Sequence, residues 1–182
     1  MKNIFKISAV LFIGVLLVFS SCEKDEQIIE GCSDSSAMNF QSLATSNDGS
    51  CVFAYEIAQG QWDIETACEE LIISIPLLGD FPIALNDMFP DTVEITGEGN
   101  GVVAMDINGN IVLADVANDG DVTIQEGQKI SLDTGVAGVV DVNITGSGTI
   151  DSPANGDLTL NLAFEIPLAG TQSSSCEITF SK

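Results

Sequence analysis

From Tyr55 onward the chain consists of short runs rich in Val, Ile, Leu and Thr, separated by Gly, Asn and Asp. Runs of this length and spacing are typical of an antiparallel barrel or sandwich. No segment requires a helix longer than about three turns, which argues against an α/β fold. We therefore predict an all-β fold, either an antiparallel β-barrel or a β-sandwich. The expected strands are Gln61–Ala67, Leu71–Pro76, Thr92–Thr96, Gly101–Ile107, Asn110–Val116, Asp121–Gln125, Lys129–Leu132, Val139–Ile150, Gly156–Ile166 and Cys176–Phe180.

The clearest hairpin turn of this domain is Asn108-Gly109, which joins Val102–Ile107 to Asn110–Val116. Asn-Gly supplies the positive φ angles that a type I′ turn requires. The stretch Ile83–Phe89, which directly follows a proline, is expected to form either a short helix or an irregular lid.

The beginning of the chain has the layout of a secretory signal peptide. A basic start is followed by an apolar run, Ala9–Phe19, and by two serines before Cys22. The run has 11 residues, whereas a membrane-spanning helix needs roughly 20. The residues Phe19-Ser20-Ser21-Cys22 resemble the lipobox of bacterial lipoproteins, although that family prefers Leu at the position of Phe19. The resemblance implies that residues 1–21 are a lipoprotein signal peptide and that Cys22 carries the lipid. The alternative is an ordinary signal peptide with a cysteine near its cleavage point.

Charge limits the functions open to the exported chain. Removing residues 1–21 leaves 161 residues with 3 lysines against 27 Asp and Glu, a formal charge of −24, and no Arg or His. Nucleic-acid binding is not expected, because it needs clustered Lys and Arg. An anionic membrane surface would repel the domain, so the lipid rather than a basic patch must hold it there. Without His, the chain lacks the residues for Ser-His-Asp and Cys-His catalysis and for the usual zinc sites.

The remaining four cysteines are Cys32, Cys51, Cys68 and Cys176. An even number in an exported chain indicates two disulfides, for which three pairings are possible.

Gly31 to Val52 resembles the short cysteine module GC-T-D-P-x-A-x-N-Y-x-P-x-A-x-x-D-D-G-S-C of exported Bacteroidota proteins. The matching positions are Gly31, Cys32, Asp34, Ala37, Asn39, Ala44, Asp48, Gly49, Ser50 and Cys51. The positions that depart from the pattern are Ser35, Phe40, Ser42 and Asn47. The resemblance implies a Cys32–Cys51 disulfide within a module of residues 31–54, which is too short for a core of its own. In the chain-entropy model, closing a loop of this size contributes about 3 kcal/mol.

Oxygen atoms in this module could bind Ca²⁺. The candidate ligands are Asp34, Asn39 and Asp48, together with backbone carbonyls. We favour the alternative that these side chains cap turns. The module is then a spacer, and no metal or other cofactor is expected beyond this possible Ca²⁺.

Residues 22–30 form an acidic tether that contains Glu23-Lys24-Asp25-Glu26. This segment resembles the export signal that follows the lipidated cysteine in surface-exposed lipoproteins of the Bacteroidota. The resemblance implies attachment to the bacterial outer membrane and display on the cell surface, with a periplasm-facing position as the alternative. A solvated linker would have the same composition.

Within the predicted β domain of residues 55–182, residues 59–182 resemble the lipocalin-like domains that follow the same module in exported Bacteroidota proteins. Those domains begin with a G-x-W or G-x-Y strand near a cysteine and end with C-x-x-T-[FL]-x-K. Gly60-Gln61-Trp62 with Cys68, and the segment Cys176–Lys182, match these patterns. The resemblance implies a lipocalin-like barrel, a Cys68–Cys176 disulfide where the first and last strands meet, and Trp62 as a plug at one end. Closing so long a loop approaches about 4.7 kcal/mol in the chain-entropy model.

Carboxylates are the main catalytic groups left to consider, beside hydroxyls and Tyr55. The pairs considered are Glu69 with Glu70, Glu94 with Glu98, and Asp106 with Asp115. Adjacent residues on a strand point to opposite faces, so the first pair could not act on one bond. The segments 106–110 and 118–121 resemble fragments of calcium loops but lack the downstream Glu, and hairpin turns explain both. We expect no enzyme.

The sequence therefore predicts a lipid-anchored, non-enzymatic, lipocalin-like domain that binds a small apolar ligand or none. The alternative is a structural or adhesive surface domain that acts through its exterior loops. A carboxylate-based hydrolase is a third hypothesis, and it would need two buried acids facing each other. The sequence identifies no protein partner.

Overall fold

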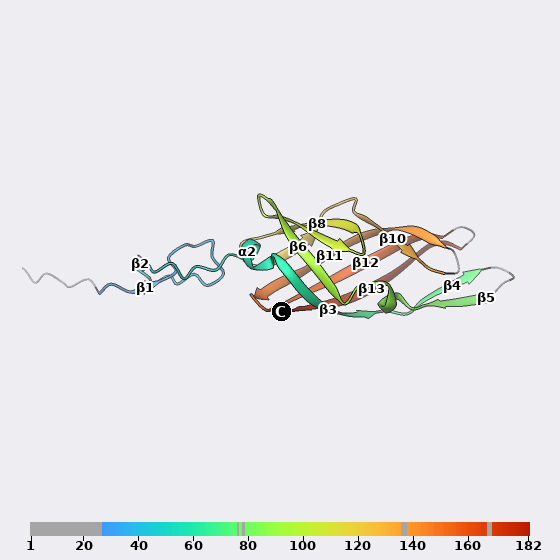
Figure 1. The fold of residues 1–182 in the computed structure, drawn as a ribbon, viewed down its shortest axis with the longest axis horizontal. Coiled ribbons are helices and arrows are strands. Elements are labelled where there is room, and N and C mark those ends of the chain that lie inside the picture. Colours follow the sequence, from blue (N-terminus) through green and yellow to red (C-terminus); the bar gives the residue numbers. More distant parts are fainter. Residues whose placement is uncertain (1–26, 76, 78, 136–137, 167–168) are drawn as a thin grey trace, which may run out of the picture.

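The structure, a computed structural model, describes residues 27–182 apart from 76, 78, 136–137 and 167–168. Cys22 and the predicted signal peptide lie outside the described residues. The described chain is almost entirely β (Figure 1), and none of its helices is long and apolar enough to span a membrane. The elements are β1 (Glu30–Gly31), β2 (Ser46–Asn47), α2 (Ala54–Ala58), β3 (Gly60–Cys68), β4 (Leu71–Ile75), β5 (Gly79–Ile83), the 3₁₀ helix η1 (Leu85–Met88), β6 (Thr92–Gly99), β7 (Val102–Ile107), β8 (Asn110–Val116), β9 (Asp121–Ile124), β10 (Lys129–Asp133), β11 (Val139–Ser152), β12 (Asn155–Ile166) and β13 (Gly170–Ser181).

The main sheet closes on itself, so the predicted antiparallel barrel is confirmed. The sheet order is β10-β11-β12-β13-β3-β6-β7-β8-β9, and β9 pairs back onto β11. All strands except β10 therefore form a closed ring, and each neighbouring pair in it is antiparallel. The first strand of the ring, β3, lies beside the last, β13, as closure of a barrel requires.

Strand alternation determines what lies inside the barrel. Every second residue of β12 is buried, from Leu158 to Ile166, and the residues between them mostly face solvent. The same period of two continues on β11 and β13, because successive side chains of a strand point to opposite faces. Gly148 on β11 faces the interior, and a Cβ atom there would collide with the backbone of Asp157 on β12. Glycine at this position lets the two strands approach closely enough to close the ring.

The Asn108-Gly109 turn has the backbone that the sequence predicts. Both residues have positive φ, 52° and 84°, and the amide of Gly109 donates to Asp106 Oδ1 at 2.6 Å. The short helix expected within Ile83–Phe89 is η1.

Within residues 55–182, one strand was not predicted, and another begins well before its expected start. β5 pairs with β4 as a separate two-stranded hairpin, with Pro82 opposite Ile72. β13 starts at Gly170 rather than Cys176, because β12 offers it partners along its full length. The hairpin lies at the end of the barrel where β11, β12 and β13 extend beyond the other strands (Figure 1). Ile73 of β4 and Phe164 of β12 are both completely buried in one hydrophobic core.

The segment before α2 is a small module with little regular structure. Its two short strands, β1 and β2, pair in parallel, and Cys32 is bonded to Cys51. Cys68 on β3 is bonded to Cys176, its direct partner on β13. The structure thus contains both disulfides that the two resemblances imply.

Candidate functional site

The barrel interior is filled by its own side chains. The largest completely buried ones are apolar and come from several strands, and they include Trp62, Phe164, Leu160 and Leu162. The interior cavity between Met105, Leu158 and Phe180 has a volume of about 10 Å³, which is room for roughly one water molecule. A drug-sized ligand needs roughly 300–1,000 Å³. This interior cavity is therefore too small for an apolar ligand.

One end of the barrel is closed by α2. Ala54 and Ala58 of this helix are buried against the core. The hydroxyl of Tyr55 accepts a hydrogen bond from the amide of Gly99, at the end of β6, at 2.8 Å. Short side chains let the helix sit close to the strand ends, and the tyrosine fixes it to the rim. Sequence reasoning missed this cap, because a helix of five residues is too short to produce a periodic pattern.

Trp62 lies beneath this helix and is completely buried. Its indole Nε1 donates to the carbonyl oxygen of Ala58 at 2.8 Å, so its polar atom is satisfied. The ring of Phe180 packs edge-on against the indole, with centroids 6.1 Å apart at 81°. Trp62 therefore joins the first strand of the barrel, the last strand and the helical cap.

Lys182 completes this end of the barrel. Its Nζ lies 4.0 Å from the centroid of the Trp62 ring, and it donates to the carbonyl oxygens of Ile57 at 3.0 Å and Gln59 at 2.8 Å. Partial burial lowers the pKa of the lysine, while two carbonyls and an aromatic face surround its ammonium group. The C-terminal motif, Cys176–Lys182, thus meets the Gly60-Gln61-Trp62 motif at this end of the barrel. This role of Lys182 was not predicted from the sequence.

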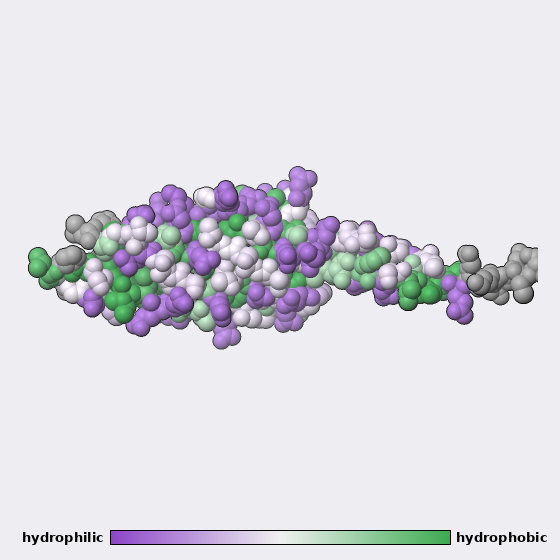
Figure 2. All heavy atoms as spheres, turned by 180° about the vertical axis from the view of Figure 1, so that it is seen from behind, coloured by the Kyte–Doolittle hydropathy of each residue, from purple (hydrophilic) through white to green (hydrophobic). Residues whose placement is uncertain are grey.

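The opposite end is closed by the β4–β5 hairpin and η1. The amide of Cys68 donates to Asn86 Oδ1 at 2.8 Å, and the hydroxyl of Ser174 donates to the carbonyl oxygen of Glu69 at 3.0 Å. At this same end of the molecule, large apolar side chains are exposed at Ile72, Leu77 and Val139. We call these three residues the distal apolar side chains. Figure 2 shows hydrophobic residues on the surface at the end of the molecule away from the module.

The described structure also has two open grooves on its surface. One, of about 380 Å³, crosses the outer face of β11, β12 and β13, where Asn143, Thr145 and Asn161 line it together with serines. The other, of about 540 Å³, lies between Ser35–Met38 of the module and the β8–β9 turn at 117–119. Both are open to solvent, and polar residues make up more than half of the lining residues of each.

The carboxylate pairs considered above are all exposed on the outer surface. Asp106 accepts from the amide of Gly109, and Asp115 accepts from the Gln125 side chain at 2.9 Å. Asp106 faces Glu94 across β6 and β7 rather than Asp115. The buried polar or charged residues of the described chain are Thr134 and Ser174, so no carboxylate of these pairs lies in a dry cleft.

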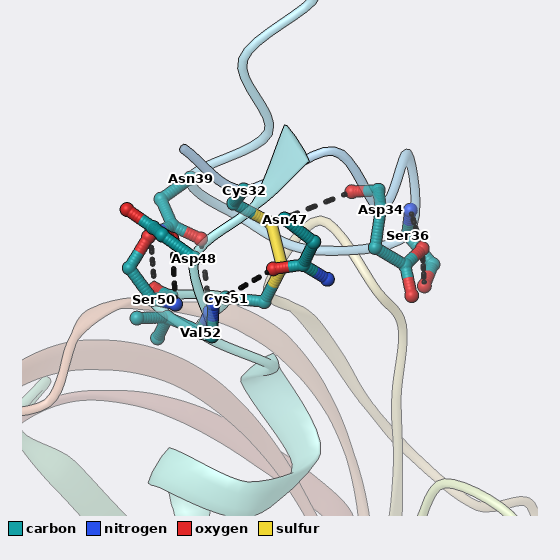
Figure 3. Close-up of a disulfide and its surroundings, with 10 residues drawn as sticks. Cys32, Asp34, Ser36, Asn39, Asn47, Asp48, Ser50, Cys51 and Val52 are labelled. Carbon is teal, nitrogen blue, oxygen red and sulfur yellow. Dashed lines mark hydrogen bonds between the residues drawn. A yellow bond between two sulfur atoms is a disulfide. The ribbon is translucent and has the colours of Figure 1, made fainter. Parts of the chain in front are cut away.

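The oxygen atoms proposed as Ca²⁺ ligands in the module form turns instead (Figure 3). The amide and hydroxyl of Ser36 donate to Asp34. Asn39 accepts from the amide of Val52 at 2.8 Å and donates to the carbonyl of Ser50 at 2.6 Å. The amide of Ser50 donates to Asp48 at 2.9 Å. Within the described part of the chain, no three His, Cys, Asp or Glu residues come together as a metal site.

Hydrogen bonds to these two carboxylates change how they titrate. The pKa of Asp34 is lowered by the backbone and side chain of Ser36. The pKa of Asp48 is lowered by the side chain and backbone of Ser50. Both effects favour the ionised form of the carboxylate in the folded module. This is expected for side chains that accept hydrogen bonds within turns.

Comparisons with known proteins add little to this picture. No family model matches the chain, and no curated protein matches it. Among solved structures, the chain is similar to one titled "Structure of EF1p2_mFAP2b bound to DFHBI", with 14% identity, 71% of this chain and 96% of that chain covered, and a TM-score of 0.36. A likeness at this level supports no conclusion about function.

Proposed function

We propose that this protein is a lipid-anchored, non-enzymatic cell-surface domain that binds its partner through the outside of the barrel. The observation that supports this best is the filled interior, whose cavity of about 10 Å³ leaves the outer surface as the place for contact. An apolar ligand inside the barrel would have to displace core side chains such as Trp62 or Phe164, each completely buried. Displacing such a side chain costs several kcal/mol.

The end with the distal apolar side chains is the surface best suited to this contact. Leu77 is fully exposed, and Val139 and Ile72 are exposed beside a core that is otherwise well covered. The barrel domain as a whole is strongly acidic and would repel an anionic partner. A partner that met this end would gain apolar contact there without facing the whole acidic barrel. We therefore infer an outward-facing protein partner with an apolar contact surface.

The proposal of a lipid anchor is based on the sequence alone. Cys22 follows a short apolar run, and the acidic tether follows Cys22. With the lipid at that point, the module would act as a spacer between the membrane and the barrel. The end of the barrel that carries the hairpin would then point away from the membrane.

Native mass spectrometry of the full lipidated chain, purified in detergent from its own host, tests the exterior mode of binding. We expect the mass of the processed chain plus its lipid, with no further small molecule. A stoichiometric apolar molecule that survives purification would contradict the proposal and support a ligand inside the barrel.

Protease treatment of intact host cells tests whether the protein is displayed on the cell surface. The barrel should be cleaved from intact cells, and Cys22→Ser should release the protein from the membrane fraction. A barrel that is protected until the outer membrane is opened would show that the protein faces the periplasm instead.

A further inference from the structure

The module carries a second exposed apolar surface, at the end away from the barrel. Ile28 and Leu43 are 74% and 73% exposed, and Ile29 is 42% exposed. The amide of Ile29 donates to Thr45 Oγ1, and the amides of Thr45 and Ser46 donate to the carbonyl of Ile29. These bonds hold the segment of Ile28 and Ile29 against the segment that follows Leu43. We call these three residues the module apolar patch, and Figure 2 shows hydrophobic residues at this end of the module.

The module has two unlike sides. On the side toward the barrel, Met38 packs against the barrel core, and Asp34 forms its turn with Ser36 beside the β8–β9 turn. On the side away from it, no residue of the described chain covers the patch. Phe40, at 44% exposure, belongs to the same 40–45 segment as Leu43. A stapled segment this short cannot bury such side chains in a core of its own, so they must remain in water or meet another surface.

The position of the patch along the chain indicates which surface that is. Ile28 lies six residues after Cys22, and six residues span at most roughly 20 Å. A lipid on Cys22 would therefore keep the patch within reach of the membrane interface. Interfacial segments typically bury their apolar side chains about 5–10 Å into the boundary between headgroups and acyl chains.

The distribution of acids agrees with this orientation. Residues 55–182 carry 21 of the 27 acids, whereas residues 31–54 carry 2, Asp34 and Asp48. Leu43 thus belongs to the least acidic part of the exported chain, whereas Ile28 and Ile29 lie in the tether of residues 22–30, which carries the other 4 acids. Because a charged group resists entry into the interface, the module can approach a lipid surface more closely than the barrel can.

From these observations we infer that the module apolar patch rests on the lipid bilayer and orients the barrel away from it. The inference depends on the lipid anchor of the proposed function. The lipid supplies the attachment, and the patch supplies the orientation. The module would then contact the membrane and fix the orientation of the barrel, rather than act as a flexible spacer.

Tryptophan substitution in the full lipidated chain tests this orientation. The variant Leu43→Trp places an indole in the patch, and Val139→Trp is the matched control, since Val139 is 69% exposed at the other end of the molecule. Trp62, completely buried, contributes the same background emission to both. Each variant is reconstituted into phosphatidylcholine vesicles with and without brominated acyl chains. Ile28→Trp serves as a second variant in case Leu43→Trp disturbs the module.

We expect the indole introduced by Leu43→Trp or Ile28→Trp to shift its emission to shorter wavelength on vesicles and to lose intensity with brominated lipid. The indole introduced by Val139→Trp should do neither. If the chain floats with the vesicles but the patch variants are quenched no more than the control, the orientation is wrong while the anchor stands. If the wild-type chain does not float with vesicles at all, the anchor fails, and the orientation fails with it.

Discussion

The cysteine module and the barrel each contain one disulfide, but the two regions are stabilised in different ways. In the module, residues 31–54, the buried apolar side chains before α2 are Cys32 and Ala37. In the barrel, Cys176 is one member of a core that extends across all the strands of the ring. The same covalent bond therefore replaces a core in one region and supplements a core in the other.

This difference shows how the two regions should respond to damage. The module is held by the Cys32–Cys51 bond and by hydrogen bonds of its Asn, Asp and Ser residues. Removing any one of these leaves few apolar contacts to keep its shape. The barrel is held by apolar burial at roughly 25 cal/mol per Å², so a local change there spreads through a cooperative unit.

The largest effect should follow removal of the Cys68–Cys176 bond. The variant Cys68→Ser with Cys176→Ser loses the constraint on a loop of 108 residues, worth up to about 4.7 kcal/mol in the chain-entropy model. The urea midpoint of the barrel, followed by far-ultraviolet circular dichroism, should fall accordingly. An unchanged midpoint would mean that the core alone specifies closure of the ring.

Removal of the Cys32–Cys51 bond should have a smaller and local effect. The variant Cys32→Ser with Cys51→Ser loses about 3 kcal/mol in the same model, but only within the module. Amide hydrogen exchange should speed up at Met38 and Gln41, whose amides donate to Val52 and Cys32. The urea midpoint of the barrel should stay where it is. A midpoint that falls with the module would show that the two regions unfold together.

A smaller effect still is expected at the helical cap. Lys182→Met keeps most of the side-chain length but removes the hydrogen bonds to Ile57 and Gln59, at a cost of about 1 kcal/mol. Trp62 should become more accessible to acrylamide in fluorescence quenching. Lys129→Met removes the same charge from β10, where the side chain has no hydrogen bond to any described residue, and is the matched control. Equal quenching in both variants would argue that the lysine does not hold the cap.

The smallest effect should be a loss of module stability at low pH. Hydrogen bonds lower the pKa of Asp48 in the folded state. The ionised carboxylate therefore stabilises the folded module at pH values above the pKa of the unfolded state, and this stabilisation is lost as the pH falls through the pKa of the folded state. The module should therefore loosen below about pH 4. The NMR shift of the Ser50 amide should titrate there in the wild type and lose this titration in Asp48→Asn. A titration that persists in Asp48→Asn would assign the effect to another group.

The barrel could be predicted from the sequence because most of its strands alternate strictly and end in turn residues such as Asn108-Gly109. β5 was missed because Gly79 and Pro82 disfavour a strand, and a two-stranded hairpin tolerates Pro at its edge. The first half of β13, Gly170–Ser175, is polar and short of apolar alternation. It becomes a strand because β12 lies beside it, which is a property of the fold and not of the segment.

The site was harder to predict than the fold. Trp62 and the cysteines could be singled out by their motifs, but the partners of Trp62 come from α2 and from the far end of the sequence. Whether the interior holds a ligand depends on how the side chains from many strands fill one volume. No pattern along the chain measures that volume, so the filled interior emerged only from the structure.

Side chains take part in holding the barrel wall beside β8. After β9 ends at Ile124, the amide of Gln125 still donates to the carbonyl of Leu113, and beyond it two side-chain amides bridge β8 to the following chain. Gln128 Oε1 accepts from the amide of Leu113 at 3.2 Å, and Asn110 Oδ1 accepts from the amide of Ser131 at 3.0 Å. A ladder built from backbone groups opens only when strands separate, but these two bonds open when a side chain rotates. This part of the wall, between β8 and the start of β10, can therefore open by side-chain rotation while the paired strands around it stay together.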